Sequence, residues 1–156
     1  MGKVVAIVTT SEAGAPLRSV TEATLESGKG LVGDRYYERS GTFSEKLTDS
    51  GDWELTLIEN EEIQRFNEAH GLTLAPASFR RNIITGGIRL NDLVGRRFHV
   101  GSAILEGMRL CEPCAHLGKL IGPAVVKGMV HRAGLRARII TGSSVRVGDE
   151  VVVLQD

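Results

Sequence analysis

The sequence predicts a mainly β protein: a closed or strongly bent barrel of short strands with a few small helices. Two observations support this fold class. Short β-branched runs recur along the whole chain, and many of them end at glycine. Only two or three segments have the apolar period of a helix, which does not fit a fold that alternates strands and helices. Many short strands with glycine turns are typical of barrels, so we expect the helices to be insertions between barrel strands.

Composition predicts one domain, residues 1–156, because this length is enough for a single core. The chain is 42% hydrophobic and 24% charged, which are globular values. Nineteen basic residues balance nineteen acidic ones, so net charge gives no reason to expect nucleic acid or a membrane surface as a partner. No stretch resembles a signal peptide or a membrane span, and two cysteines without an export signal indicate reduced thiols. We therefore expect a cytoplasmic protein.

The first half of the chain contains the clearest helix signal. Apolar Ile63, Phe66 and Ala69 form one stripe, acidic residues occupy the first turn, and Gly71 ends the pattern, which predicts a helix over residues 60–70. Three glycines within residues 28–33 are typical of a tight connection. Strands are expected at residues 3–9, 20–25 and 55–58, and loops at residues 11–17 and 38–52.

The second half predicts more strands than helices. A hairpin is expected over residues 98–106, because Gly101 and Ser102 supply a turn between two strand-like runs. The remaining expected elements are a strand at 79–85, a short helical turn within 123–131, a strand at 136–141 and a closing hairpin over 145–154.

The chemical centre that we expect is residues 109–122, which hold both cysteines of the chain, Cys111 and Cys114. A strand-like run precedes them, and the apolar residues after them have helical spacing up to Gly122. Pro113 suits the first turn of such a helix, where a missing N–H costs little. Cys114 would then lie near a helix N-terminus, where unpaired amides favour a thiolate.

The Cys-X-X-Cys pattern leaves several interpretations open. A thioredoxin-like redox pair needs a βαβ context, which is absent here. Zinc could be bound by Cys111, Cys114, His116 and His131, although three of these ligands are crowded into six residues. Both cysteines could also be structural, since free cysteine is commonly a small buried side chain. Cys111 could act as a resolving thiol.

Two basic clusters accompany the cysteines. Arg80 and Arg81 precede Asn82; on a strand, neighbouring side chains face opposite ways, so at most one of these arginines would face the barrel interior. Arg132 and Arg138 form part of a second cluster after Cys114. The guanidinium group suits phosphate or carboxylate, so the pattern is consistent with an anionic ligand held beside a thiolate, and a solvated surface pair is the alternative.

An ordered series of motifs resembles the MOSC domain, the C-terminal domain of molybdenum-cofactor sulfurases, which also occurs as small stand-alone bacterial proteins. The motifs cover nearly the whole chain in the family's order. They are Gly-Leu-Val-Gly-Asp-Arg (30–35), Leu-Thr-Leu-Ile (55–58), Arg-Arg-Asn (80–82), Leu-Val-Gly-Arg-Arg-Phe-His-Val-Gly (93–101), Pro-Cys (113–114) and Val-Gly-Asp (147–149).

The resemblance implies a bent β-barrel, like that of pyruvate kinase, and a role in handling the molybdenum–pyranopterin cofactor. By residue, it implies that Cys114 carries sulfane sulfur as a persulfide or ligates molybdenum. Arg80, Arg81 and Asn82 would hold the pterin phosphate and amides, and the downstream Arg132 and Arg138 would assist. Related members with this cofactor reduce N-hydroxylated compounds, which is an alternative function, and a zinc-binding or structural module is another.

The resemblance also implies partners. The larger sulfurases link the family to pyridoxal phosphate through a further domain, which this chain lacks, so we expect it neither to generate sulfur nor to synthesise the cofactor. The expected donor is a cysteine desulfurase or another sulfur donor. The expected acceptor is a molybdoenzyme or a cofactor-biosynthesis protein.

Overall fold

The computed structural model describes residues 2–9, 18–34, 54–113 and 115–154. The strands are β1 (Gly2–Thr9), β2 (Arg18–Val20), β3 (Glu22–Glu26), β4 (Gly30–Leu31), β5 (Leu55–Glu59), β6 (Ile83–Gly86), β7 (Arg97–Val100), β8 (Ala103–Leu110), β9 (Leu135–Thr141), β10 (Ser143–Arg146) and β11 (Glu150–Val153). The helices are α1 (Asn60–His70), α2 (Ala115–Ile121) and α3 (Ala124–Gly128), with short 3₁₀ helices η2 (Pro76–Phe79) and η3 (Leu90–Leu93). The predicted mainly β class is confirmed.

Seven strands form a closed barrel in the order β11, β7, β8, β9, β5, β6, β1, and β1 pairs back with β11 to close it. The β5–β6 pair is parallel, and helix α1 belongs to the connection between these two strands. The other barrel pairs are antiparallel. A second sheet of β10, β3 and β4 lies beside the barrel. The barrel predicted from many short strands is therefore present.

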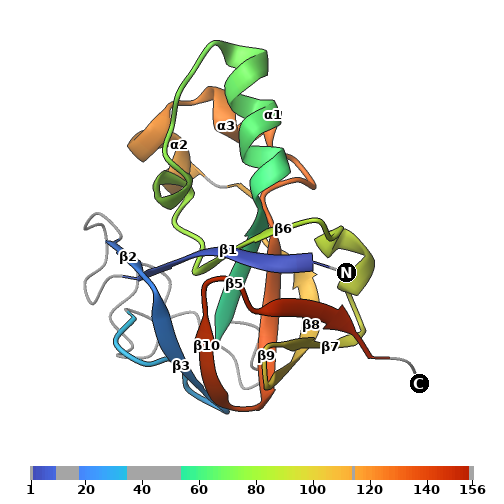
Figure 1. The fold of residues 1–156 in the computed structure, drawn as a ribbon. Helices are drawn as coiled ribbons and strands as arrows, with labels where there is room; N and C mark the ends of the chain where they lie inside the picture. Colours follow the sequence, from blue (N-terminus) through green and yellow to red (C-terminus); the bar gives the residue numbers. More distant parts are fainter. Residues whose placement is uncertain (1, 10–17, 35–53, 114, 155–156) are drawn as a thin grey trace.

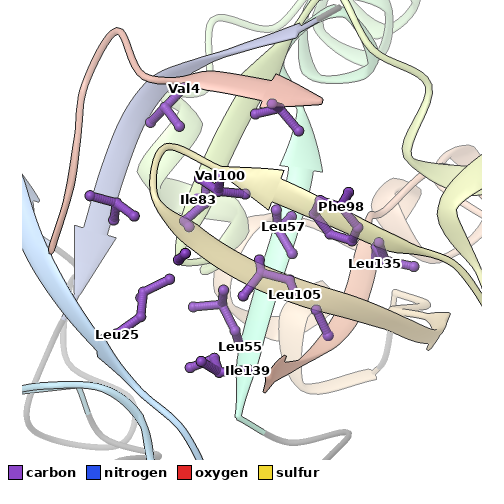
Figure 2. Close-up of a cluster of buried hydrophobic side chains, with 14 of the residues drawn as sticks. Val4, Leu25, Leu55, Leu57, Ile83, Phe98, Val100, Leu105, Leu135 and Ile139 are labelled. Carbon is purple, nitrogen blue, oxygen red and sulfur yellow. The ribbon is translucent and has the colours of Figure 1, made fainter. Parts of the chain in front are cut away.

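The main core fills the barrel interior, where side chains from both sheets meet (Figure 2). Strand β9 shows the alternation: Leu135, Ala137 and Ile139 are buried, while Arg136 and Arg138 between them are more exposed. This period-2 pattern is the one that a strand with one face on a core requires. The second sheet contributes Leu25, Leu31 and Val145 to the same core.

A second core lies outside the barrel, beneath the helices. In Figure 1, α1, α2 and α3 gather on one side of the barrel, beyond β1 and β6. Phe66 of α1 and Phe79 of η2 meet edge to face with ring centroids 6.0 Å apart. Val8, Ile58 and Ile84, from β1, β5 and β6, complete the layer beneath them. This helical layer positions the segment between β8 and α2, which holds both cysteines.

Several predicted elements match the structure closely. The helix over residues 60–70 is α1, and Gly71 ends it in the left-handed conformation, with Ile63 and Phe66 buried but Ala69 exposed. The hairpin predicted over residues 98–106 is β7 and β8. The helical turn within 123–131 is α3. The loops predicted at residues 11–17 and 38–52 lie outside the described residues.

Two predicted elements are wrong. The closing hairpin is absent, because β10 pairs with β3 whereas β11 pairs with β7 and β1. The strand predicted at residues 79–85 begins only at Ile83, because the chain first forms η2 and then turns at Arg80, whose φ of 62° is left-handed. Arg80 and Arg81 are therefore not on a strand, and the argument that they face opposite sides of a sheet does not apply.

Candidate functional site

The candidate site is built around the cysteine loop, residues 111–114, which joins β8 to α2. Strand β8 ends at Leu110 and helix α2 begins at Ala115. This strand–loop–helix order confirms the prediction, and Gly122 follows the end of α2 with a φ of 117°. Pro113 precedes the helix instead of lying in its first turn. Cys114 itself lies outside the described residues.

Cys111 is buried, with only 2% of its surface exposed. Its backbone N–H donates to the carbonyl oxygen of Gly134 at 2.8 Å, which ties the end of β8 to the start of β9. The structure therefore gives Cys111 a position in the interior, as the structural interpretation of this cysteine expects.

Arg81 holds the cysteine loop from inside. Its guanidinium donates to four backbone carbonyls: Nε to Ala133 at 2.8 Å, Nη1 to Phe79 at 3.3 Å, and Nη2 to Cys111 and Glu112, both at 3.3 Å. We call this arrangement the Arg81 clamp. Arg81 is 9% exposed, so its guanidinium is largely shielded from water and finds its hydrogen-bond partners within the protein.

Asn82 is buried and joins three strands. Its side-chain Oδ1 accepts from the backbone N–H of Thr56 at 3.2 Å and from the Thr56 hydroxyl at 3.1 Å. Its Nδ2 donates to the carbonyl of Val8 at 3.4 Å. Asn82 thus links β5 and β1 at the point where β6 begins.

Glu112 holds the cysteine loop from outside. Its Oε1 accepts from the backbone N–H of His131 at 2.7 Å, and its Oε2 lies 2.5 Å from Nδ1 of the same residue. Because a carboxylate only accepts, Nδ1 carries the proton. His131 has a left-handed φ of 59°, and the carbonyl of His131 also accepts from Asn91 at 2.8 Å. The loop before β9 is therefore fastened to the cysteine loop.

The downstream arginines lie apart from the Arg81 clamp. Arg132 pairs with Glu62 of helix α1 through a 3.3 Å contact and is exposed. Arg138 pairs with Glu106 across β8 and β9 at 2.7 Å. Leu135 pairs with Leu110 at the cysteine-loop end of these strands, so Arg138 lies roughly 10 Å farther along β9.

Glu54 is a buried carboxylate that the sequence analysis missed. Its Oε1 accepts from the backbone N–H groups of Gly28 at 3.0 Å and Ile139 at 3.2 Å. Burial raises the pKa of Glu54 above its ordinary value, while these two hydrogen bonds and the charge of Arg138 oppose the rise. The backbone of Glu54 also lies close to β4: a Cβ at Gly30 would lie 2.6 Å from the Glu54 carbonyl oxygen, so glycine at position 30 permits this approach.

The structure thus brings Arg81, Glu112, His131 and Ala133 together at the cysteine loop. The side chains of Arg132 and Arg138 pair with Glu62 and Glu106 instead. The sequence analysis missed Glu112, although its place between the two cysteines is visible in the motif. The zinc interpretation included His131, whose imidazole faces Glu112. Among the described side chains, no three His, Cys, Asp or Glu residues gather to hold a metal ion.

The Arg-Arg-Asn motif fits an external phosphate poorly at two of its three positions. The four contacts of Arg81 occupy four of the five N–H donors of a guanidinium. The side-chain oxygen of Asn82 accepts from Thr56, and its amide nitrogen donates one hydrogen to the carbonyl of Val8. Arg80 is also 9% exposed. The role of these three residues as cofactor ligands stays a prediction.

The chain belongs to the MOSC domain family, whose model matches residues 21–152. This is a family associated with molybdenum-cofactor-related proteins. No curated protein matches the chain.

The fold is that of known MOSC structures. YuaD from Bacillus subtilis superposes with a TM-score of 0.82 and 18% identity, covering 98% of this chain and 96% of that one. YiiM from Geobacillus stearothermophilus has a TM-score of 0.75 and 15% identity, covering 99% and 76%. YiiM from Escherichia coli has a TM-score of 0.65 and 22% identity, covering 99% and 70%. At these identities the likeness concerns the fold.

A membrane-spanning helix is absent from the described part of the chain, because none of its helices is both long and apolar enough.

Proposed function

We propose that this protein handles sulfur or the molybdenum cofactor in the cytoplasm through Cys114, which accepts sulfane sulfur as a persulfide or ligates molybdenum. The observation that carries the proposal is the construction of the cysteine loop. A buried guanidinium and a carboxylate fasten it on two sides, and α2 begins at the residue after Cys114. The family membership supplies the chemical class.

The sulfur-transfer step needs only a thiolate at Cys114 and a donor persulfide. The Cys114 sulfur attacks the terminal sulfur of the donor, forming a new S–S bond. The donor's own S–S bond breaks, and the donor thiolate leaves with the electron pair. The proton of the donor persulfide stays with the transferred sulfur, so the step needs no external oxidant or reductant. A thiolate is also a soft ligand that suits a sulfur-rich metal centre.

The partners follow from this chemistry. The donor is a protein persulfide, for which a cysteine desulfurase is the appropriate class. The acceptor is a molybdoenzyme or a protein of cofactor assembly. The anionic part of such a cofactor would require basic side chains, for which Arg80, Arg132 and Arg138 are the candidates. Arg132 and Arg138 would have to exchange their pairing with Glu62 and Glu106 for the ligand.

The proposal is tested by replacing Cys114 with Ser and incubating the protein with a cysteine desulfurase and cysteine. Mass spectrometry should show an adduct of about 32 Da, one sulfur atom, on the wild type and on a Cys111→Ser control, but not on Cys114→Ser. After cofactor loading, elemental analysis should likewise find molybdenum on the wild type and on Cys111→Ser, but not on Cys114→Ser. Equal loading of Cys114→Ser and wild type by both measurements would refute the role of Cys114.

The same samples distinguish the alternatives. One zinc per chain, lost on changing either cysteine, would indicate the zinc module instead. Steady turnover of a hydroxylamino purine by cofactor-loaded protein with a reducing partner would indicate the reductase.

A further inference from the structure

We infer that Arg81 is a positioning residue for the cysteine loop and not a ligand of the cofactor's phosphate. This inference deepens the proposed function, and it rests on that proposal only for the importance of Cys114. The Arg81 clamp itself is made entirely of described residues.

The direction of the hydrogen bonds is the first argument. All four contacts of the guanidinium in the described structure end on backbone carbonyls, and these come from three segments far apart in sequence: η2 at Phe79, the cysteine loop at Cys111 and Glu112, and the segment before β9 at Ala133. A phosphate ligand needs donors that point toward the ligand, and at most one N–H of Arg81 is left for one.

Burial is the second argument. With 9% of its surface exposed, Arg81 is enclosed by the segments that it bonds. Removing the guanidinium would leave several carbonyls without donors in a place that water reaches poorly, and each such group is costly. The segment that would move first is the cysteine loop, because two of the four carbonyls belong to it.

The third argument is the planar arrangement of the N–H donors on the guanidinium of Arg81. A guanidinium carries donors on three nitrogens in a fixed plane, whereas a lysine carries them on one nitrogen. A single ammonium cannot reach Phe79, Ala133 and the Cys111–Glu112 pair together. Charge alone would satisfy a phosphate but would not restore the clamp, so Lys and Gln at position 81 should behave alike.

Cys111 provides the readout, because the residue is only 2% exposed and its carbonyl is bonded by Arg81. In a Cys114→Ser background, the rate of Cys111 alkylation by iodoacetamide reports opening of the loop. We expect Arg81→Lys and Arg81→Gln each to raise this rate at least about tenfold, the ratio that corresponds to 1.4 kcal/mol. The matched control is Arg65→Gln, because Arg65 also bonds a carbonyl of the helical layer, that of Gly128, but none among the described residues 111–113 of the cysteine loop. This control should change the rate less than about twofold.

A second readout concerns Cys114 and is measured only in variants that still unfold cooperatively, so that a shift reports the loop and not loss of the fold. In a Cys111→Ser background, the midpoint of the pH–rate profile for Cys114 alkylation should move in both Arg81 variants toward the free-cysteine value of about 8.5. If the profile of the protein with Arg81 intact already has that midpoint, the proposed function fails, while Cys111 protection still tests the clamp.

Three outcomes decide the inference. Faster Cys111 alkylation in both Arg81 variants supports it. Loss of cooperative unfolding in both variants, with Arg65→Gln intact, also supports it, because removing a phosphate ligand would leave the fold in place. Unchanged Cys111 protection in Arg81→Lys, whether or not Arg81→Gln loses it, overturns the inference.

Discussion

Glu54 shows how a single buried side chain can hold two sheets together at an electrostatic cost. One carboxylate oxygen accepts from Gly28 beside β4 and from Ile139 in β9, so the second sheet is fastened to the barrel. Burial raises the pKa of Glu54, which means that the folded protein binds a proton at this site more tightly than the unfolded chain does. The contribution of Glu54 to stability therefore falls as the pH rises from the pKa of Glu54 in the unfolded chain through its higher pKa in the folded protein.

Glu54→Gln should remove this pH dependence and keep the acceptor oxygen for both N–H groups. We expect the stability of the variant, relative to wild type, to increase between pH 4 and pH 7, because the amide carries no charge to desolvate. Urea unfolding of both proteins across this range measures the difference. A variant that loses stability relative to wild type as the pH rises would mean that the carboxylate is a net stabilising partner of Arg138.

At the same scale, the residue types of the site could be predicted, but their contacts could not. The motif around Cys111 and Cys114 is visible in the sequence. The partners of Arg81 are not, because Ala133 and Cys111 lie 52 and 30 residues away. The prediction that Arg80 and Arg81 lie on a strand was wrong, since the chain turns at Arg80 in the left-handed conformation and β6 begins only at Ile83.

Elements with strong local signals were predicted well, and those defined by distant pairing were not. Helix α1 was predicted with its observed bounds because its stripe, its acidic first turn and Gly71 lie within twelve residues. Strands β10 and β11 were expected where they occur, but their partners β3, β1 and β7 come from elsewhere in the chain. Pairing of this kind joins segments far apart in the sequence and leaves no local trace.

Gly134, at the start of β9, offers a test at the scale of elements. Its φ is 114°, its carbonyl accepts from Cys111, and a Cβ there would lie 1.9 Å from the Leu57 carbonyl oxygen in β5. Gly122, after α2, has nearly the same φ, 117°, but open space around it. The two positions therefore separate backbone strain from steric clash.

We expect Gly122→Ala to lower the free energy of unfolding by about 1–2 kcal/mol, the cost of a positive φ. Gly134→Ala should lower it by at least about 2 kcal/mol more, because β5 and β9 must also move apart. Chemical unfolding of the two variants compares them directly. Equal losses would show that the close approach of Gly134 to Leu57 does not constrain the protein.

The described part of the molecule is a closed barrel with a second sheet beside it and a helical layer outside it. Strand β11 closes the ring by pairing with β1, so residues at both ends of the chain belong to one sheet (Figure 1). The fold class was predicted from short strands and glycine turns, because these follow from local sequence. The end of β8 and the start of β9 meet beside the helical layer, and the cysteine loop is held at this boundary by Arg81 and Glu112.

The most direct test of Cys114 as the reactive thiol is its alkylation in the native protein, resolved from that of Cys111 by tandem mass spectrometry. Cys111 is buried in the folded molecule. We therefore expect Cys114 to react at least about a hundredfold faster than Cys111 near neutral pH, where an activated thiolate is already ionised. Equal rates, or faster reaction of Cys111, would contradict the proposal that the fold presents Cys114 for chemistry.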